Sequence, residues 1–210
     1  GLYARNWLQP LIRHGSLAFF DNIDAEVQVL CCDDLVLPIV IANPNAQVKN
    51  SYVCSPCTHY LDYAQEEIRL EMTDTPRLQK SLEQMIQILR RAFIPLQFEK
   101  VVYVNNWLLS TNLYPDFNAQ NLERIRDFLI KKFPDHALIF RSVNVHLNHE
   151  IFKTLKALRF ADIVSRQVYI LDPSKGIYKK KNPYKEDVRL DKKTPYQWID
   201  ADAIQAQDIP

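Results

Sequence analysis

Two cysteines stand three residues apart, at the junction of an expected strand and an expected helix. Cys54 and Cys57 form a Cys-x-x-Cys pair, which can exchange disulfides when a helix N-terminus lowers the pKa of its first thiol. The same pair is half of a zinc site, and a tetrahedral site needs two further ligands. Cys31 and Cys32 are adjacent, so they point to opposite faces of a strand, and His59 offers one ligand. We expect a structural role and no metal, with metal binding and thiol redox chemistry as alternatives.

Residues 58–67, "THYLDYAQEE", gather several ionisable side chains on one helical segment. His59, Tyr63, Glu66 and Glu67 recur at intervals of one to four residues and can share a helix face. A carboxylate or an imidazole beside an amine can take its proton as a general base. Glu67 is therefore a candidate catalytic residue, and a solvated helix face is the alternative.

A second polar group, "RSVNVHLNHE", covers residues 141–150 at the end of an expected strand. Asn144 and His146 alternate, so in an extended chain they share one face. His146 is a candidate catalytic residue, and a polar side chain satisfied by its neighbours is the alternative. Asn148 is expected to cap the helix that follows.

The stretch "VVYVNNWLLSTNLYPDFN", residues 101–118, turns from a strand into a helix without a glycine. The turn after a strand is the usual ligand crevice of an α/β sheet, and Trp107 and Tyr114 can line a groove there. The alternative is an ordered loop whose Asn, Ser and Thr side chains satisfy its own backbone. The candidate binding residues are Asn105, Asn106, Trp107, Leu108, Ser110, Thr111, Asn112 and Tyr114.

The first half of the chain must supply hairpins and two helices around these residues. Apolar runs predict strands at 16–20, 25–32, 35–42 and 48–53, with a turn at Asp33-Asp34 and an edge position or bulge at Pro38. Helices are expected from Thr58 to about Met72, and from Pro76, behind a Thr75 cap, until Pro95 ends it.

The second half alternates strands and helices. We expect a strand at 100–104, a helix at 118–133, a strand at 136–141, a helix from Asn148, a long strand at 161–171 and a final strand at 196–199. This order indicates an α/β or α+β fold with a mixed, mostly antiparallel central sheet flanked by helices. Between Pro173 and Lys193, eight Lys or Arg residues stand against three acids, which predicts a mobile or ligand-facing loop.

The pieces "KVVYVNNWLL", "ALIFRSVN", "EIFKTLKALRFADIVSRQVYILD" and "YQWI" resemble the fourth to seventh strands and the third and fourth helices of the GNAT (Gcn5-related N-acetyltransferase) fold. "LKALRF" is similar to the passage that precedes a strand in that family, with Arg159 where glycine is usual. The resemblance covers about half of the chain and rests on the order of elements.

The resemblance implies an acyltransferase that moves an acyl group from a thioester, on acyl-CoA or an acyl carrier protein, to a small-molecule or peptide amine. It also implies that Asn144 contacts the donor, which makes Asn144 a third candidate catalytic residue. GNAT enzymes bind pyrophosphate through a glycine-bearing loop after the fourth strand, and that position holds "NNWLLSTNLYPDFN". An ordinary acetyl-CoA cradle is therefore not expected there, and a non-catalytic GNAT-like domain that binds a partner or supports a second domain is the alternative.

The last residues, "IDADAIQAQDIP" at 199–210, are similar to the opening of a GNAT domain. The resemblance thus implies one half of a tandem-GNAT, FemAB-like acyltransferase. In this interpretation residues 1–195 form a GNAT-like domain, with a hairpin-rich part (1–57), two helices (58–95) and a β-α-β-α-β-β half (100–199). Residues 196–210 are the last strand and the start of a second GNAT module.

Composition sets the broad class of the protein. The 210 residues are 47% hydrophobic and 24% charged, with a net charge of +1, which is typical of a globular domain. The near-neutral charge argues against dedicated nucleic-acid binding, and no apolar run reaches a membrane span. Four cysteines are too few for a disulfide scaffold, so we expect a cytoplasmic protein.

Overall fold

A computed structural model describes residues 2–93, 95–165, 167–195, 199–200 and 203–204. The chain divides into two compact units, Gly1–Ser165 and Arg166–Pro210.

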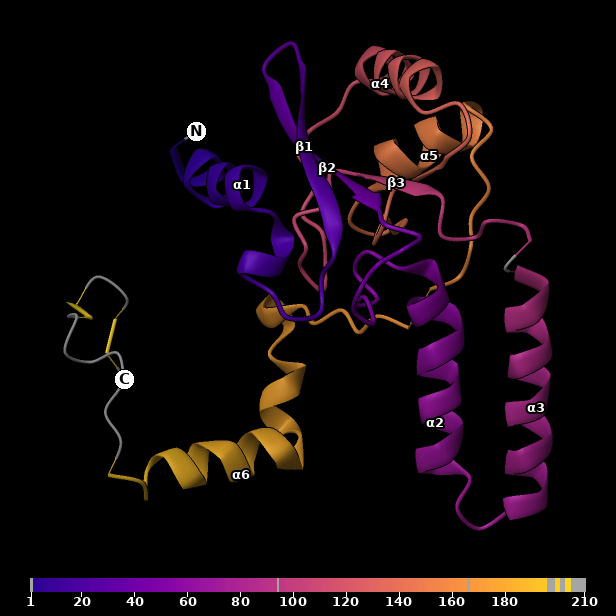
Figure 1. Cartoon of the computed structure of the whole chain (residues 1–210). Coiled ribbons are helices and arrows are strands. Elements are labelled where there is room, and N and C mark those ends of the chain that lie inside the picture. The colour runs from indigo at the N-terminus through magenta and orange to yellow at the C-terminus, as the bar shows by residue number, and fades with distance from the viewer. Residues whose placement is uncertain (1, 94, 166, 196–198, 201–202, 205–210) are drawn as a thin grey trace. The chain divides into compact units, whose positions relative to one another are not determined.

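The first unit is built on a four-stranded sheet with the order β1-β2-β3-β4 (Figure 1). The strands are β1 (Ala25–Cys32), β2 (Leu35–Ala42), β3 (Val101–Val104) and β4 (Ala137–Ile139). The pairs β1/β2 and β2/β3 are antiparallel, whereas β3 and β4 are parallel. The predicted mixed, mostly antiparallel sheet with flanking helices is confirmed at this level.

The inner position of β2 shows that the prediction for Pro38 is wrong, because the strand is neither an edge nor bulged. The carbonyl of Pro38 accepts a hydrogen bond from the Asn106 N–H at 3.1 Å, so the proline nitrogen also faces the β3 side. Val104 is the last β3 residue and pairs with Ile39. The β2/β3 ladder therefore begins at Ile39, and Pro38 lies just outside it, where the N–H that proline lacks breaks no ladder hydrogen bond.

Seven helical segments surround this sheet in the first unit's described residues. They are α1 (Leu2–His14), η1 (Ser16–Ala18), the π-helical η2 (Thr58–Asp62), α2 (Tyr63–Glu71), α3 (Pro76–Phe93), α4 (Ala119–Lys132) and α5 (His149–Ala157). The helices expected near 58–72, 76–93, 118–133 and after Asn148 are confirmed. Within the part of the chain that the structure describes, none of the helices combines the length and the apolar character needed to cross a bilayer.

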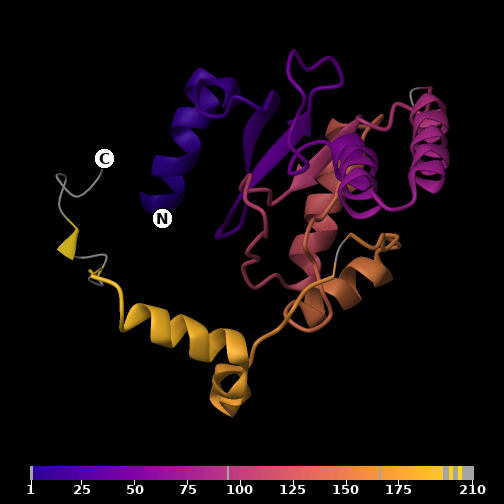
Figure 2. The same ribbon diagram turned by 90° about the horizontal axis from the view of Figure 1, so that it is seen from below.

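The two faces of the sheet carry separate apolar clusters, and α1 and α4 lie on opposite faces (Figures 1 and 2). On one face Leu8 and Leu11 of α1 pack with Val40 and Tyr103. On the other face α4 packs against β2 and β3 through Ile125 and Leu129. Both faces of β2 and β3 are buried, which explains why these strands read as continuous apolar runs.

Three predicted strands are absent from the described residues. Residues 16–20 contain η1, because Gly15 adopts φ 80° and the Ser16 hydroxyl bonds to the Ala25 backbone at 2.9 and 3.1 Å. Residues 48–53 contain a bend at Val48 and the start of a turn at Tyr52, with no strand. Residues 161–165 and 167–171 have β-forming side chains but no paired strand, and Val164 is 90% exposed. Strand-forming residues give a strand only where a sheet edge accepts them.

The second unit contains helical segments where the sequence predicts a loop. They are η3 (Pro173–Lys175), η4 (Ile177–Lys180) and α6 (Asn182–Asp191). Pro183, near the start of α6, fixes a helical φ and needs no hydrogen-bond partner there. The strand predicted at 196–199 falls on residues 196–198, which lie outside the described residues, and Ile199 belongs to no element.

Candidate functional site

Two polar segments meet where β3 and β4 end. Because these strands are parallel, their carboxyl ends lie at the same edge of the sheet. The turn of residues 105–114 follows β3, and Arg141 follows β4 by two residues. All eight predicted binding residues lie on this turn.

Two asparagines hold this turn together from inside. Asn105 is fully buried, and its amide donates to the Leu113 carbonyl at 2.9 Å and accepts from the Trp107 indole N–H at 3.0 Å. Asn106 donates to the Val53 carbonyl at 2.7 Å and accepts from the Leu108 N–H at 3.1 Å. These contacts fit the predicted alternative, a loop that satisfies its own backbone.

The Arg141 side chain, 9% exposed, ties the turn to β4. Its guanidinium donates to the Asn106 amide oxygen at 3.2 Å, to the Leu109 carbonyl at 3.3 Å and to the Ser110 carbonyl at 3.5 Å. It also lies over the Tyr52 ring, 5.7 Å from the centroid. A buried cation therefore fills the place between the two strand ends.

Tyr114 and Asn112 close the far end of the turn. The Tyr114 hydroxyl donates to the Arg141 carbonyl at 2.6 Å, and burial raises the Tyr114 pKa well above its usual value. Asn112 is 4% exposed, and neither of its amide atoms has a hydrogen-bond partner in the described part of the chain. The Asn112 amide lies close enough to Tyr114 to lower the pKa of its hydroxyl, against the rise that burial causes.

An aromatic cluster adjoins Arg141 on its Tyr52 side. We define it as Tyr52, His59, Tyr60 and Tyr63, whose neighbouring ring centroids are 4.6 to 5.8 Å apart. The His59 Nε2 lies 2.9 Å from the Ser165 hydroxyl. Burial raises the pKa of Tyr60, and the positive charge of Arg141 opposes that rise. The cluster places an imidazole and phenols beside a fixed cation.

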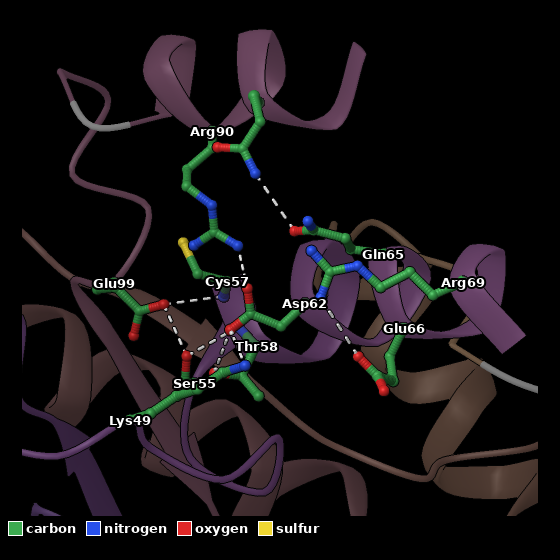
Figure 3. Close-up of polar contacts among 11 residues, drawn as sticks. Lys49, Ser55, Cys57, Thr58, Asp62, Gln65, Glu66, Arg69, Arg90 and Glu99 are labelled. Carbon is green, nitrogen blue, oxygen red and sulfur yellow. Dashed lines mark hydrogen bonds and ion pairs between the residues drawn. The ribbon is translucent and has the colours of Figure 1, made fainter. Parts of the chain in front are cut away.

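The Cys-x-x-Cys segment belongs to a structural polar network (Figure 3). The Glu99 carboxylate accepts from the Ser55 hydroxyl at 2.9 Å and from the Cys57 N–H at 2.8 Å. Burial and Glu99 raise the pKa of Cys57 to about 12, and the same two causes raise that of Cys54 to about 12. Both cysteines are free thiols, and a raised pKa opposes the thiolate that redox chemistry needs.

No group of three or more His, Cys, Asp or Glu side chains able to hold a metal ion occurs among the residues that the structure describes. Asp62, which lies near the Cys-x-x-Cys segment, forms ion pairs with Arg90 and, at 3.4 Å, with Lys49 (Figure 3).

None of the three predicted catalytic residues takes part in the hydrogen bonds between Arg141 and the turn of residues 105–114. Glu67 is exposed on α2, and His146 is exposed between β4 and α5. The Asn144 side chain accepts from the Leu147 N–H at 2.9 Å, so it shapes its own turn. Asn148 precedes α5 but makes no capping hydrogen bond, because its amide oxygen accepts from Asn144 instead.

Among the other predicted binding residues, Leu108 is buried, Trp107 is half-buried, and Ser110 and Thr111 are exposed. The sequence interpretation did not select Arg141 or Tyr52. Arg141 offered one signal, since a basic residue at the end of the strand predicted at 136–141 lies level with the polar turn after the neighbouring strand. Nothing in the sequence links Tyr52 to Arg141 or to the turn after β3.

A hollow of about 560 Å³ lies elsewhere, at the opposite edge of the sheet. It is lined near the start of β1 by Asp24 and Glu26, and by His14 and His136. His136 Nδ1 is buried without a partner among the described residues. None of the residues that line this hollow belongs to the turn of residues 105–114, and Arg141 is not among them.

Comparison with protein-family models, with curated proteins and with solved structures finds no match for this chain.

Proposed function

We propose that this chain is a GNAT-type domain of an acyltransferase, with its acyl-transfer site at the carboxyl ends of β3 and β4. The observation that carries the proposal is the parallel β3-α4-β4 crossover within an otherwise antiparallel sheet. This is the arrangement that the GNAT resemblance implies for the fourth and fifth strands. A polar turn and a buried cation stand where the two strands end.

The reaction needs an amine freed of its proton and a group that stabilises the tetrahedral oxyanion. We assign the base role to His59, because it lies in the aromatic cluster beside Arg141, whereas Glu67 and His146 are exposed elsewhere. Arg141 positions the turn and supplies positive charge near a developing oxyanion. The amine attacks the thioester carbonyl, and the thiol leaves with the proton that the base has taken.

The donor is a thioester carried by acyl-CoA or by an acyl carrier protein. The N–H groups of Asn106 and Leu108 already bond within the chain, so they do not contribute to a pyrophosphate cradle. A carrier protein, or a second GNAT module, would then hold the pantetheine arm.

The decisive experiment measures acyl transfer from acetyl-CoA, longer acyl-CoAs and acyl carrier protein to a panel of amines, together with thermal shifts for each donor. We expect His59→Ala to lower the turnover at least about 100-fold, while the matched surface variant Glu67→Ala leaves it unchanged. Loss of activity in Glu67→Ala alone would reassign the base.

A non-catalytic GNAT-like domain is the second candidate, and the internally bonded turn favours it. Hydrogen bonds to the chain's own backbone occupy polar groups of the Asn105, Asn106 and Arg141 side chains. If no donor shifts the melting temperature and no amine is acylated, this second function replaces the first.

A further inference from the structure

The second unit contains a local excess of positive charge. Residues 173–193 hold eight Lys or Arg side chains and three acids, a net charge of +5, whereas the whole chain has a net charge of +1. The rest of the chain is therefore net acidic. The near-neutral total, which argues against dedicated nucleic-acid binding, hides this basic segment.

The fold of this segment gathers its cations into a row along α6 (Figure 1). A helix turns about 100° per residue, so Lys185, Arg189 and Lys192 fall within an arc of about 60°. Lys181, the residue before α6, extends the row by one helical turn. We call these four residues, all exposed, the basic row. Neighbours in it are three or four residues apart, which separates them by about 5–6 Å along the helix surface.

The acids of α6 lie outside the basic row. Asp187 is about 160° from Lys185 around the helix, and Asp191 is about 120° from it. Glu186 is the nearest acid, about 60° from Arg189. Among the residues that the structure describes, no ion pair joins the basic row to these acids. Because like charges at this spacing repel, the row favours a ligand whose negative charges also repeat.

An aromatic pair lies beside the basic row. The Tyr178 and Tyr184 rings meet edge to face, with their centroids 5.1 Å apart. The Lys179 ammonium lies 5.9 Å from the Tyr178 ring centroid. Tyr184 directly precedes Lys185 and is 37% exposed. An accessible aromatic ring next to a row of cations is a combination that proteins use to bind unpaired bases and the phosphates between them.

We propose that the basic row binds the phosphate backbone of a single-stranded nucleic acid, with Tyr184 against one base. Three of its four residues are lysines, which are depleted at protein–protein interfaces. A membrane-bound helix needs a broad apolar face, but the exposed Leu190 of α6 lies about 140° from Lys185 and no apolar stripe accompanies it. A nucleic-acid strand, in contrast, repeats its phosphates as the helix repeats its cations, and each contact releases a counterion.

Fluorescence anisotropy of the full chain tests this site, with labelled oligouridylate and oligothymidylate of about 16 nucleotides. Four phosphate contacts on a single strand predict that log K falls with log[salt] with a slope near −3, between about 50 mM and about 200 mM salt. Both strands offer the same phosphates, so binding of either supports the proposal. A duplex of the same length should bind more weakly at the same salt, because its bases cannot stack on Tyr184.

Neutralising the row tests its residues. Lys185→Gln with Arg189→Gln removes two charges and keeps good helix formers, so the helical circular dichroism should not change. The affinity should fall at least about 10-fold, and the salt slope should become about 1.4 less steep. The matched control, Lys131→Gln with Lys153→Gln, removes two exposed charges from α4 and α5. It has the same net charge and should leave both values unchanged.

Replacing Tyr184 separates stacking from charge. Tyr184→Leu keeps an apolar side chain against Tyr178 but loses the stacking ring. The affinity should fall at least about 5-fold at an unchanged salt slope, and Tyr184→Trp should retain it.

Three results would each overturn the proposal. The first is no binding of either strand at about 100 µM protein and about 50 mM salt. The second is a control variant as defective as the variant of the row. The third is preferential binding of the duplex, or of vesicles that contain phosphatidylserine. None of these results affects the acyltransferase proposal, because the basic row belongs to the second unit and the acyl-transfer site to the first.

Discussion

At the scale of single residues, Arg141 connects more of the candidate site than any residue that the sequence interpretation selected. It bonds to the turn through Asn106 and two carbonyls, and it covers the Tyr52 ring. A buried guanidinium remains in place only where its donors find acceptors. The Asn106 amide oxygen is one such acceptor, and the shape of the turn exposes the others.

Replacing Arg141 should therefore destabilise the whole first unit. We expect Arg141→Met to lower the free energy of unfolding by about 2–4 kcal/mol, because several charge-assisted hydrogen bonds are lost and buried carbonyls are left unpaired. Arg141→Lys should recover less than half of the loss, since a lysine cannot span the same acceptors. Urea titration followed by fluorescence measures both values, and a loss below about 0.5 kcal/mol would contradict the assigned role.

Asn106 and Asn112 make a matched pair of buried asparagines with opposite expectations. Asn106→Leu should cost about 2–3 kcal/mol, because its partners Val53, Leu108 and Arg141 each lose a bond. Asn112→Leu should be neutral or stabilising, since its amide has no partner among the described residues. The same urea titration compares them, and equal losses would show that Asn112 is satisfied in solution.

The two thiols of the Cys-x-x-Cys segment should be almost inert. Their pKa rises from an ordinary 9.0 to about 12, so at pH 8 the thiolate fraction is about 1,000-fold lower than for an ordinary thiol. Alkylation of Cys54 and Cys57 by iodoacetamide, followed by mass spectrometry, should be much slower than that of the exposed Cys31.

The same shift fixes the direction of a pH effect. Between about pH 9 and pH 12 the unfolded thiols ionise and the folded ones do not, so the free energy of unfolding should fall as the pH rises through this window. Serine at both positions should reduce that fall. Fast alkylation of folded Cys57 at pH 8 would contradict the assignment.

At the scale of elements, α4 shows how far local sequence determines structure. The Asn118 side chain accepts from the Asn121 N–H at 2.7 Å, and the Asn121 side chain accepts from the Asn118 N–H at 3.4 Å. This reciprocal cap, with the inward Ile125 and Leu129, makes the start of the helix visible in the sequence.

Removing the cap should weaken this element by a predictable amount. Asn118→Ala should lower the free energy of unfolding by about 1 kcal/mol, and Asn118→Asp should preserve most of it, because aspartate caps as well as asparagine. Calorimetry of the two variants provides the comparison. A larger loss in Asn118→Asp than in Asn118→Ala would show that the cap is not the source of the effect.

The elements that the sequence predicted well are those with a strong local pattern. The β1–β2 hairpin and β3 combine apolar runs with a turn, and α3 and α4 combine a helical apolar period with a signal at the N-terminus. The strand predicted at 161–171 fails because pairing depends on a sheet edge that no local pattern reveals. The sequence predicted the position of the turn after β3. It did not predict that Arg141, about 30 residues further along the chain, would hydrogen-bond to this turn. Such contacts follow from strand pairing rather than from spacing.

At the scale of the whole molecule, the division at Ser165 separates two interpretations of the chain. The first unit closes its sheet with β4, and the residues beyond it up to Ser165 form no strand. The GNAT resemblance instead gives 161–171 a strand in the sheet. If the sheet ends with β4, residues beyond Ser165 add little to its stability. If residues 161–171 form a strand of the sheet, their removal should destabilise it.

A chain that ends at Ser165 tests this difference. Since the first unit is compact by itself, we expect its melting temperature to lie within about 3 °C of the full chain's, a change of less than about 1 kcal/mol. Thermal unfolding by circular dichroism gives the answer. Loss of a cooperative transition would mean that residues beyond Ser165 complete the sheet.

The backbone of the turn after β3 limits how this site can change by mutation. Asn105 and Leu108 hold left-handed φ angles of 56° and 60°, three residues apart, where glycine would relieve about 1–2 kcal/mol each. Yet glycine at 105 removes two side-chain hydrogen bonds, and glycine at 108 removes a core side chain. Each single replacement is a net loss, although the backbone itself would gain. Glycine can therefore enter this turn without a loss of stability only through linked substitutions that also replace the lost side-chain support, which is an epistatic barrier.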